Sequence, residues 1–395
     1  MKKRIFSFLL AAMAIVVLNS CGAEEAPELG SIPTANVITL KGSSIEVSGS
    51  GMKAEGNTVT ISAPGSYTVK GSLDNGQIIV DVAEEAVETE LVLDNVSISN
   101  LSGPAIHVET GKDLKLKFKG ENNIVSGSKD AAAAEASGAA IYAEDDMSIK
   151  GEDDAVLKVF GYINNGIACK NDIDIKGGKI EITAVNNGLR GADSVEVKGG
   201  ELVISSGNDG IKSTSTDKEG KGYIDIKGGI VTVTAKGDGI SAATELNISG
   251  GTISLNSEKN GVETISDVNI SGGELYISSL SDGIQAGEAN SGMGNINISG
   301  GNVLVDAAKQ GMKPRAQMNV SGGFVLALSG KEKMLEGQGF EQFSQTGFKG
   351  DEASVSEGNS VVCKLKSTYS FKNILVGGAE KPYTVTVGNT SIIVD

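Results

Sequence analysis

A tripeptide of Asn or Asp, Gly and an aliphatic residue recurs through the middle of the chain at a nearly constant spacing. A Gly-Gly pair recurs in step with it, between successive copies. A period of about 22 residues indicates a solenoid, because a propeller blade needs about 40 residues. The glycines of the tripeptide, whose last copy has Gln310 in place of Asn or Asp, are Gly166, Gly188, Gly210, Gly239, Gly261, Gly283 and Gly311.

Apolar and polar residues alternate on both sides of each Gly-Gly pair, which is typical of half-buried strands. Two architectures fit one such unit: a hairpin of an antiparallel meander, or one coil of a parallel β-helix. Columns of equivalent residues favour the coil, because coils stacked about 4.8 Å apart align identical side chains into an apolar core and amide ladders. The aliphatic column is Ile175, Val197, Ile226, Ile248, Ile270, Ile298 and Val320, and the column before it is Asp174, Glu196, Asp225, Asn247, Asn269, Asn297 and Asn319.

We therefore predict an all-β fold, a right-handed, single-stranded parallel β-helix with a small C-terminal β cap. Parallel crossovers are nearly always right-handed, which sets the predicted hand. The β-helix should cover residues 37–330. Residues 331–395 first break the period and then return to short strands, so they should form the cap that an open solenoid end requires. On the outer surface of the β-helix, the acidic residues of the second column should be neutralised by a neighbouring column of lysines: Lys176, Lys198 and Lys227.

The N-terminus resembles a bacterial lipoprotein signal. Residues 1–20 combine a basic start with an apolar run that is too short for a comfortable membrane span. Cys21 ends a lipobox-like sequence, so we expect cleavage before it and lipidation of its thiol. Residues 21–36 then read as a flexible tether. The expectation is a lipoprotein of the bacterial outer membrane, exposed at the cell surface and touching the membrane only through its lipid anchor.

Composition excludes several kinds of site. The chain has one histidine, His107, so a His-rich zinc site cannot be built and a Ser-His-Asp triad would have to use that residue. The formal net charge of −16 disfavours nucleic acid as a partner, since phosphate binding needs a basic face. Two cysteines remain besides Cys21, and we expect Cys169 and Cys363 to be free thiols rather than a disulfide.

Four segments in combination resemble the carbohydrate-binding domain-containing β-helix family. The likeness covers roughly residues 37–395. It implies a right-handed parallel β-helix similar to that of pectate lyases. It also implies binding of cellulose and of polygalacturonate-like acidic glycans, with bound calcium and without established catalysis. The segments are SAPGSYTVKGSLDNGQIIVDV (62–82), ELVLDNVSISNLSGPAIHV (90–108), GENNIVSG (120–127) and NDGIKSTSTDKEGKGYIDIKGG (208–229).

The Asn or Asp of the tripeptide forms a column of oxygen-bearing side chains. An acidic protein would repel a uronate polymer unless a cation bridges them, and Ca²⁺ takes six to eight oxygen ligands from carboxylates and amides. Alternatively, Asn or Asp before Gly simply favours the turn conformation. The loops after the column also carry acids, among them Glu263. The predicted calcium ligands, with Asp209 at their centre, are Asn187, Asp209, Asp238, Asn260 and Asp282.

Three residues are candidates for contact with a glycan. Arg190 follows a tripeptide and should lie one coil below Lys212, near the predicted calcium cluster. The alternative for Arg190 is a surface arginine paired with a neighbouring acid. Tyr276 shares an outward strand column with Leu304 and Leu326, which is either a sugar-facing strip or a face covered by the cap. The absence of Trp favours a charged glycan over a crystalline neutral one.

The sequence thus predicts a non-catalytic, monomeric surface lipoprotein that binds acidic polysaccharide, or cellulose, with calcium. One alternative is a calcium-dependent pectate or polysaccharide lyase, because pectate lyases use a cationic base, usually Arg, beside Ca²⁺. The other is a structural, adhesin-like solenoid.

Overall fold

The computed structural model describes residues 35–83, 88–129, 138–289 and 292–395. The predicted signal at 1–20, the lipidation site Cys21 and nearly all of the tether lie outside these ranges. Every regular element within them is a β-strand, so they contain no helix that is long and apolar enough to cross a membrane.

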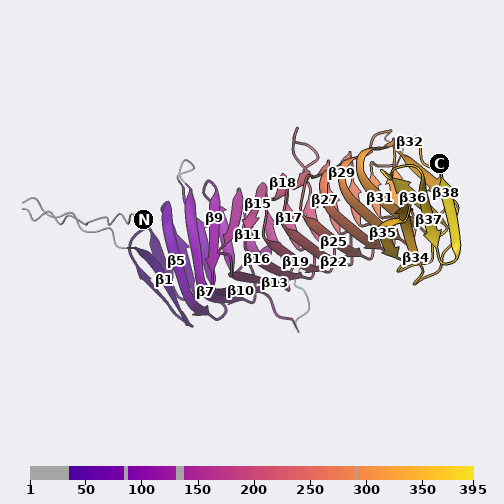
Figure 1. Ribbon diagram of the computed structural model, residues 1–395. Helices are drawn as coiled ribbons and strands as arrows, with labels where there is room; N and C mark the ends of the chain where they lie inside the picture. The colour runs from indigo at the N-terminus through magenta and orange to yellow at the C-terminus, as the bar shows by residue number, and fades with distance from the viewer. Residues whose placement is uncertain (1–34, 84–87, 130–137, 290–291) are drawn as a thin grey trace, which may run out of the picture. The chain divides into compact units, whose positions relative to one another are not determined.

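Successive coils stack along the chain, each contributing strands to three faces (Figure 1). One coil contains β14 (Asn165–Cys169), β15 (Asp172–Gly177) and β16 (Lys179–Ala184). These pair in parallel with β17 (Leu189–Gly191), β18 (Ser194–Val197) and β19 (Glu201–Ser206) of the next coil. The predicted parallel β-helix is confirmed, and the antiparallel meander is excluded for these coils.

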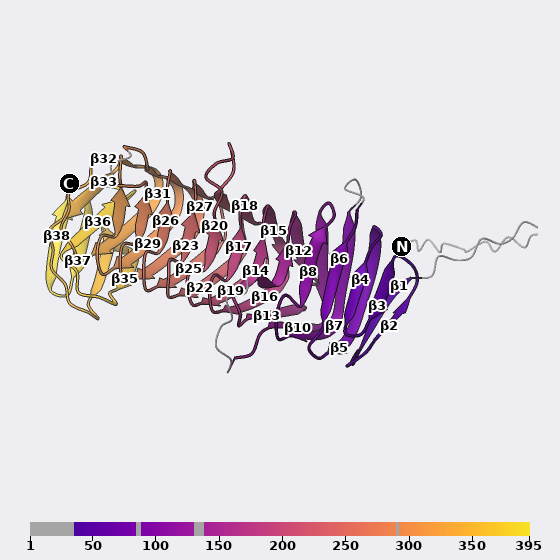
Figure 2. The ribbon, with the colours of Figure 1, turned by 180° about the vertical axis from the view of Figure 1, so that it is seen from behind.

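The sequence suggested that the tripeptides form turns between strands. In the structure each tripeptide leads into a third strand of its coil. We call the resulting twelve-stranded sheet the corner sheet; its strands lie side by side in Figure 2. Besides β14 and β17 it contains β3 (Met52–Glu55), β4 (Thr58–Ile61), β6 (Gln77–Asp81), β8 (Ile106–Thr110), β11 (Ala139–Ala143), β20 (Ile211–Ser213), β23 (Ile240–Ala242), β26 (Val262–Thr264), β28 (Ile284–Ala286) and β30 (Met312–Pro314).

The other two faces belong to one sheet that bends where the Gly-Gly pairs stand. Some of its strands run through the bend: β5 (Gly65–Leu73), β7 (Thr89–Asn100), β27 (Val268–Ser279), β29 (Ile296–Ala307) and β31 (Met318–Ser329). The others lie on one side of it: β1 (Asn36–Gly42), β9 (Leu114–Lys119), β10 (Glu121–Ser126), β12 (Met147–Gly151), β13 (Val156–Gly161), β21 (Tyr223–Ile226), β22 (Ile230–Ala235), β24 (Leu246–Ile248) and β25 (Thr252–Ser257).

Glycine is required at the bend because the backbone there is left-handed and closely packed. Gly200 has φ +87°, and a Cβ at this position would lie 2.4 Å from the carbonyl oxygen of Gly178, its counterpart one coil earlier. Each later pair repeats this close approach, which explains why Gly-Gly marks the period.

The predicted columns are in register. Asp174 pairs with Glu196, and the column continues coil by coil to Asn319. Its asparagines form the expected amide ladder; Asn269 Nδ2 donates to Asn247 Oδ1 at 2.9 Å. Lys198 lies 2.7 Å from Asp174 and 3.0 Å from Glu196, so the lysine column neutralises the acids as predicted. The inward aliphatic residues form one continuous core from Ile38 to Leu375.

Short strands, most of them antiparallel to their neighbours, close the two ends. At the start, β2 (Ile45–Ser48) pairs with β1, and β3 pairs with β4. At the other end β32 (Gly337–Gln338), β33 (Phe340–Phe343) and β36 (Asn373–Gly377) extend the bent sheet. A separate four-stranded sheet, which we call the cap sheet, contains β34 (Glu352–Glu357), β35 (Ser360–Lys366), β37 (Tyr383–Val387) and β38 (Thr390–Val394). A second apolar core joins the cap sheet to β31 and β36. Cys169 and Cys363 are both free, as predicted.

Candidate functional site

The five predicted calcium ligands form a buried ladder where the chain enters the corner sheet. Each side-chain Oδ1 accepts a hydrogen bond from the backbone N–H at the same position of the next coil. Asp209 N donates to Asn187 at 3.2 Å, Asp238 N to Asp209 at 2.9 Å, and Asn260 N to Asp238 at 2.7 Å. Asp282 N continues the ladder by donating to Asn260 at 3.1 Å. The structure therefore brings all five residues together, with Asp209 only 3% exposed.

The second carboxylate oxygens of the ladder differ in their partners. Lys212 Nζ lies 2.5 Å from Asp209 Oδ2, and Lys313 Nζ lies 2.6 Å from Asp282 Oδ2. No lysine or arginine of the described ranges forms an ion pair with Asp238. Burial raises the pKa of Asp238 to about 7, and the nearby Glu263 carboxylate adds to the shift. Glu263 lies in β26, not in a loop as the sequence suggested.

The ladder does not fit a calcium ion held by all five residues. The Oδ1 atoms already satisfy backbone N–H groups, and ammonium groups take up the second oxygens of two of the three aspartates. Among the residues that the structure describes, no group of three or more Asp, Glu, His or Cys is placed to hold a metal ion. At the ladder, Asp238 and Glu263 combine two carboxylates for which the described residues offer no cationic partner.

The middle residues of the corner strands form a stripe on the outside of the corner sheet, because alternate residues of a strand face outwards. They are half-buried except for Ala168, which is 0% exposed. Arg190 of β17 pairs in register with Lys212 of β20, and Glu263 of β26 with Gln285 of β28. We call this the outer stripe; in coil order its members are Tyr142, Ala168, Arg190, Lys212, Ser241, Glu263, Gln285 and Lys313.

Arg190 has no acidic partner, unlike its neighbour in the outer stripe. Its Nη2 donates to Thr214 Oγ1 at 3.2 Å, and within the described part of the chain no carboxylate forms an ion pair with its guanidinium. The alternative prediction, a surface arginine paired with an acid, is wrong in this respect. Lys212, by contrast, is held by Asp209. The predicted pair is therefore adjacent, as expected, and one of its two cations is open to an anion.

Sequence reasoning missed five members of the outer stripe, of which Tyr142, Gln285 and Lys313 make side-chain contacts along it. Gln285 Nε2 donates to Glu263 Oε1 at 2.7 Å and Gln285 Oε1 accepts from Lys313 Nζ at 2.5 Å, which gives a polar chain over three coils. Tyr142 stacks at 5.4 Å, ring centre to ring centre, on His107 of the coil before. Aligning the residue two after each tripeptide glycine would have revealed the stripe, because that position is outward in every coil.

Tyr276 lies apart from the outer stripe, on β27. The cap covers the far end of its column: Leu326 is 0% exposed and belongs to the second core, and Leu304 packs against that core. Tyr276 itself is 37% exposed and lines a groove between the bent sheet and β35. The prediction of a face covered by the cap is therefore confirmed for Leu304 and Leu326, while a sugar-facing role for the partly exposed Tyr276 stays a prediction.

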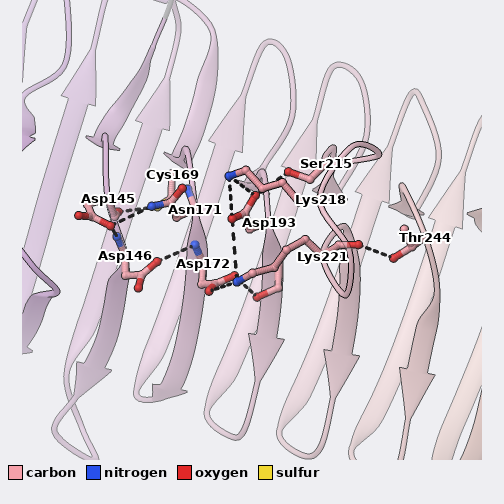
Figure 3. A network of polar contacts seen from close by, with 11 residues as sticks. Asp145, Asp146, Cys169, Asn171, Asp172, Asp193, Ser215, Lys218, Lys221 and Thr244 are labelled. Atoms are coloured by element: carbon pink, nitrogen blue, oxygen red, sulfur yellow. Dashed lines mark hydrogen bonds and ion pairs between the residues drawn. The ribbon is translucent and has the colours of Figure 1, made fainter.

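A separate polar network fastens residues 214–223, a segment that makes one coil longer than its neighbours (Figure 3). Lys218 Nζ lies 3.0 Å from both oxygens of Asp193, whose Oδ1 also accepts from Ser215 Oγ at 2.6 Å. Lys221 Nζ lies 2.7 Å from Asp172 Oδ2. Burial alone would raise the pKa of Asp193, but the Ser215 and Lys218 hydrogen bonds outweigh it and the pKa is lowered. These acids hold the insertion against the coils.

Comparisons with known proteins agree with this fold. The family model described as carbohydrate-binding domain-containing protein matches residues 55–260 and 245–378. A carbohydrate-binding domain-containing protein of Acetivibrio thermocellus is 32% identical over 191 residues, which are 46% of this chain and 66% of that relative, just under two thirds of its length.

A solved structure is similar as well. It is described as the polysaccharide lyase-like protein from C. thermocellum, in a gadolinium derivative, and has a TM-score of 0.56 and 31% sequence identity. The match covers 60% of this chain and 96% of that one. With the family model matching well over half of its residues, the chain belongs to the carbohydrate-binding domain-containing protein family.

Proposed function

We propose that the protein binds a polysaccharide carrying acidic sugars along the outer stripe, without cleaving it. The observation that carries this proposal is the guanidinium of Arg190 beside Lys212, to which no described carboxylate forms an ion pair. An arginine fork binds a carboxylate through two parallel hydrogen bonds, and the half-buried position strengthens that interaction relative to open solvent. Family membership supports carbohydrate as the ligand class.

The geometry of the corner sheet suits an extended polymer. Its outward residues repeat once per coil, about 4.8 Å apart. Polar groups capable of meeting sugar hydroxyls or carboxylates follow one another over successive coils, from Arg190 to Lys313. A single sugar would use only a part of this stripe, so a chain of sugars is the better match.

Calcium is a further part of the proposal, at one place only. Asp238 and Glu263 are the protein carboxylates that would share an ion with carboxylates of the glycan, since they have no cationic partner among the described residues. The ion would supply the positive charge that an acidic protein needs to hold an acidic polymer. Calcium titrations of chelator-treated protein, wild type against Glu263→Gln, test this assignment.

We also propose that the protein is a monomer anchored to the outer membrane through lipid on Cys21, facing the cell exterior. The basic and apolar residues before Cys21 motivate this part. Mass spectrometry of the N-terminal peptide from the native organism tests it: a diacylated or triacylated Cys21 supports the anchor, and an unmodified, uncleaved N-terminus contradicts it.

A polysaccharide lyase is the second candidate function. Two observations favour it, namely the open cation of Arg190 and the similarity to a protein described as polysaccharide lyase-like. Incubation with polygalacturonate and calcium at alkaline pH separates the candidates through the ultraviolet absorbance of unsaturated products. We expect retention of polygalacturonate without product. Product formation that is lost in Arg190→Ala would establish the lyase instead, and binding to neither acidic nor neutral glycans would favour an adhesin.

A further inference from the structure

The groove beside Tyr276 is separate from the outer stripe and differs from it in chemistry. It has a volume of about 420 Å³, in the usual range for small-ligand sites. One wall is the bent sheet, with Tyr276, Leu304 and Phe324 as its apolar part. The other wall is β35 of the cap sheet, represented by Val362.

The Tyr276 ring is held in place by the cap. Its hydroxyl lies beside the Thr368 side chain, and the Thr368 backbone N–H donates to the carboxylate of Asp306, which is 0% exposed. Burial raises the pKa of Asp306, and one of its carboxylate oxygens has no hydrogen-bond partner. The ring edge is thus fixed on the cap side while the ring remains partly exposed to the groove.

The charges in the groove disfavour an anion. Glu274 lies two residues before Tyr276 on the same face of β27, and no ion pair to it exists in the described ranges. The ammonium of Lys364, on the opposite wall, is already 2.8 Å from Glu352. A carboxylated sugar would therefore meet an uncompensated carboxylate, whereas the hydroxyl groups of a neutral sugar would donate hydrogen bonds to it.

Polar neighbours complete a lining that matches a pyranose. Asn302 pairs in register with Glu274, and Ser254 with Tyr276, so an amide and a hydroxyl border the ring and the carboxylate. In addition, β35 is an edge strand of the cap sheet, so backbone groups on its free side have no strand partner there. The apolar face of a sugar ring can stack on the tyrosine ring, and the hydroxyl groups at the edge of the sugar can form hydrogen bonds with the polar groups around it.

We infer that this groove binds a neutral sugar unit of a polysaccharide, stacked on Tyr276, as a second carbohydrate site. The inference rests on the proposed carbohydrate-binding function but assigns a different sugar class to a different place. A chain bearing both acidic and neutral units could engage both sites, and a neutral glycan would need only this one.

Calorimetric titration of the full chain with cellotetraose, xylotetraose and galactotetraose tests the inference, with polygalacturonate as the acidic reference. At least one neutral tetrasaccharide should bind. Tyr276→Ala should weaken that binding at least about fivefold by removing the stacking surface. Tyr276→Phe should stay within about twofold, which separates loss of the ring from loss of the Thr368 contact.

Val362→Arg provides an independent variant, because Val362 is 44% exposed and an arginine there should block the groove without disturbing the core. Lys176→Gln, which removes a charge outside both proposed sites, is the matched control and should keep neutral binding unchanged. Arg190→Gln is measured as well, because a loss of neutral binding there would place the neutral sugar on the outer stripe. Neutral binding that survives both groove variants, or depends on Arg190, overturns the inference, as does self-association that Tyr276→Ala abolishes. If polygalacturonate binds but no neutral sugar does, the inference fails alone; if neither binds, the proposed function fails.

Discussion

Asp238 Oδ1 accepts the backbone N–H of Asn260, which holds the same position one coil later, at 2.7 Å. The same bond joins each member of the Asn/Asp ladder to the next. A residue that looks like a metal ligand in the sequence is thereby a structural acceptor, because the N–H that precedes each corner strand would otherwise be buried without a partner.

The ladder predicts a graded effect of substitutions at Asp209. Asp209→Ala leaves the Asp238 N–H without an acceptor and Lys212 without its carboxylate, so we expect a loss of about 2–4 kcal/mol in the free energy of unfolding. Asp209→Asn keeps the acceptor oxygen, so its loss in the free energy of unfolding should be roughly half that of Asp209→Ala. Chemical denaturation measures both variants. Equal losses in the two would show that the N–H bond contributes nothing.

Asp238 predicts an unusual pH dependence of stability. Its folded pKa of about 7 exceeds the ordinary value of 3.8, so the folded state binds this proton more tightly than the unfolded state. The stabilisation of the folded state by protonated Asp238 is complete below about pH 3.8. As the pH rises, it declines by up to about 1.4 kcal/mol per pH unit, and it is lost above about pH 7.

Urea unfolding across this range, with chelator present, measures the decline. Asp238→Asn should flatten it, and Glu263→Gln should reduce it because the neighbouring charge disappears. An identical decline in wild type and Asp238→Asn would assign the effect to another group.

Asp193 predicts the opposite pH behaviour for the inserted segment. Its lowered pKa means that its contribution is present above the unfolded pKa and is lost as the pH falls through the folded pKa. Asp193→Asn should therefore destabilise the protein by about 1–3 kcal/mol at neutral pH and by less in acid. Limited proteolysis should then cut near Lys218 sooner than in wild type. Unchanged cleavage would contradict the fastening role shown in Figure 3.

The two thiols should be unreactive in the folded protein. Burial raises the pKa of Cys169 to about 12 and that of Cys363 to about 11, so almost no thiolate exists near neutral pH. Iodoacetamide should label both residues only after denaturation. Rapid labelling of native Cys169, which is fully buried, would show that the coils open locally.

The repeat in the sequence was sufficient to predict the solenoid, its register and its columns, since Ile175 and its counterparts recur at one position in every coil. Two features needed the structure. From β17 onward the corner strands are only three residues long, too short for alternation to be visible, so Glu263 was misplaced in a loop.

The roles of polar side chains also depended on partners that are far away in the sequence. Nothing in the local pattern shows that Lys313 reaches Asp282 across 31 positions, or that Arg190 finds no acid. The groove at Tyr276 required residues of β27 and β35, which the sequence separates by more than eighty positions.

The affinity of polygalacturonate for Arg190→Gln tests the central claim most directly. Lys176→Gln is the control with the same change in charge. Lys176 lies at the Gly-Gly bend, and after its substitution Asp174 still forms an ion pair with Lys198. Calorimetry at low salt should show at least about a tenfold loss for Arg190→Gln, a smaller loss at high salt, and less than twofold for the control. Wild-type affinity in Arg190→Gln, or equal losses in both variants, would contradict the outer stripe as the binding site.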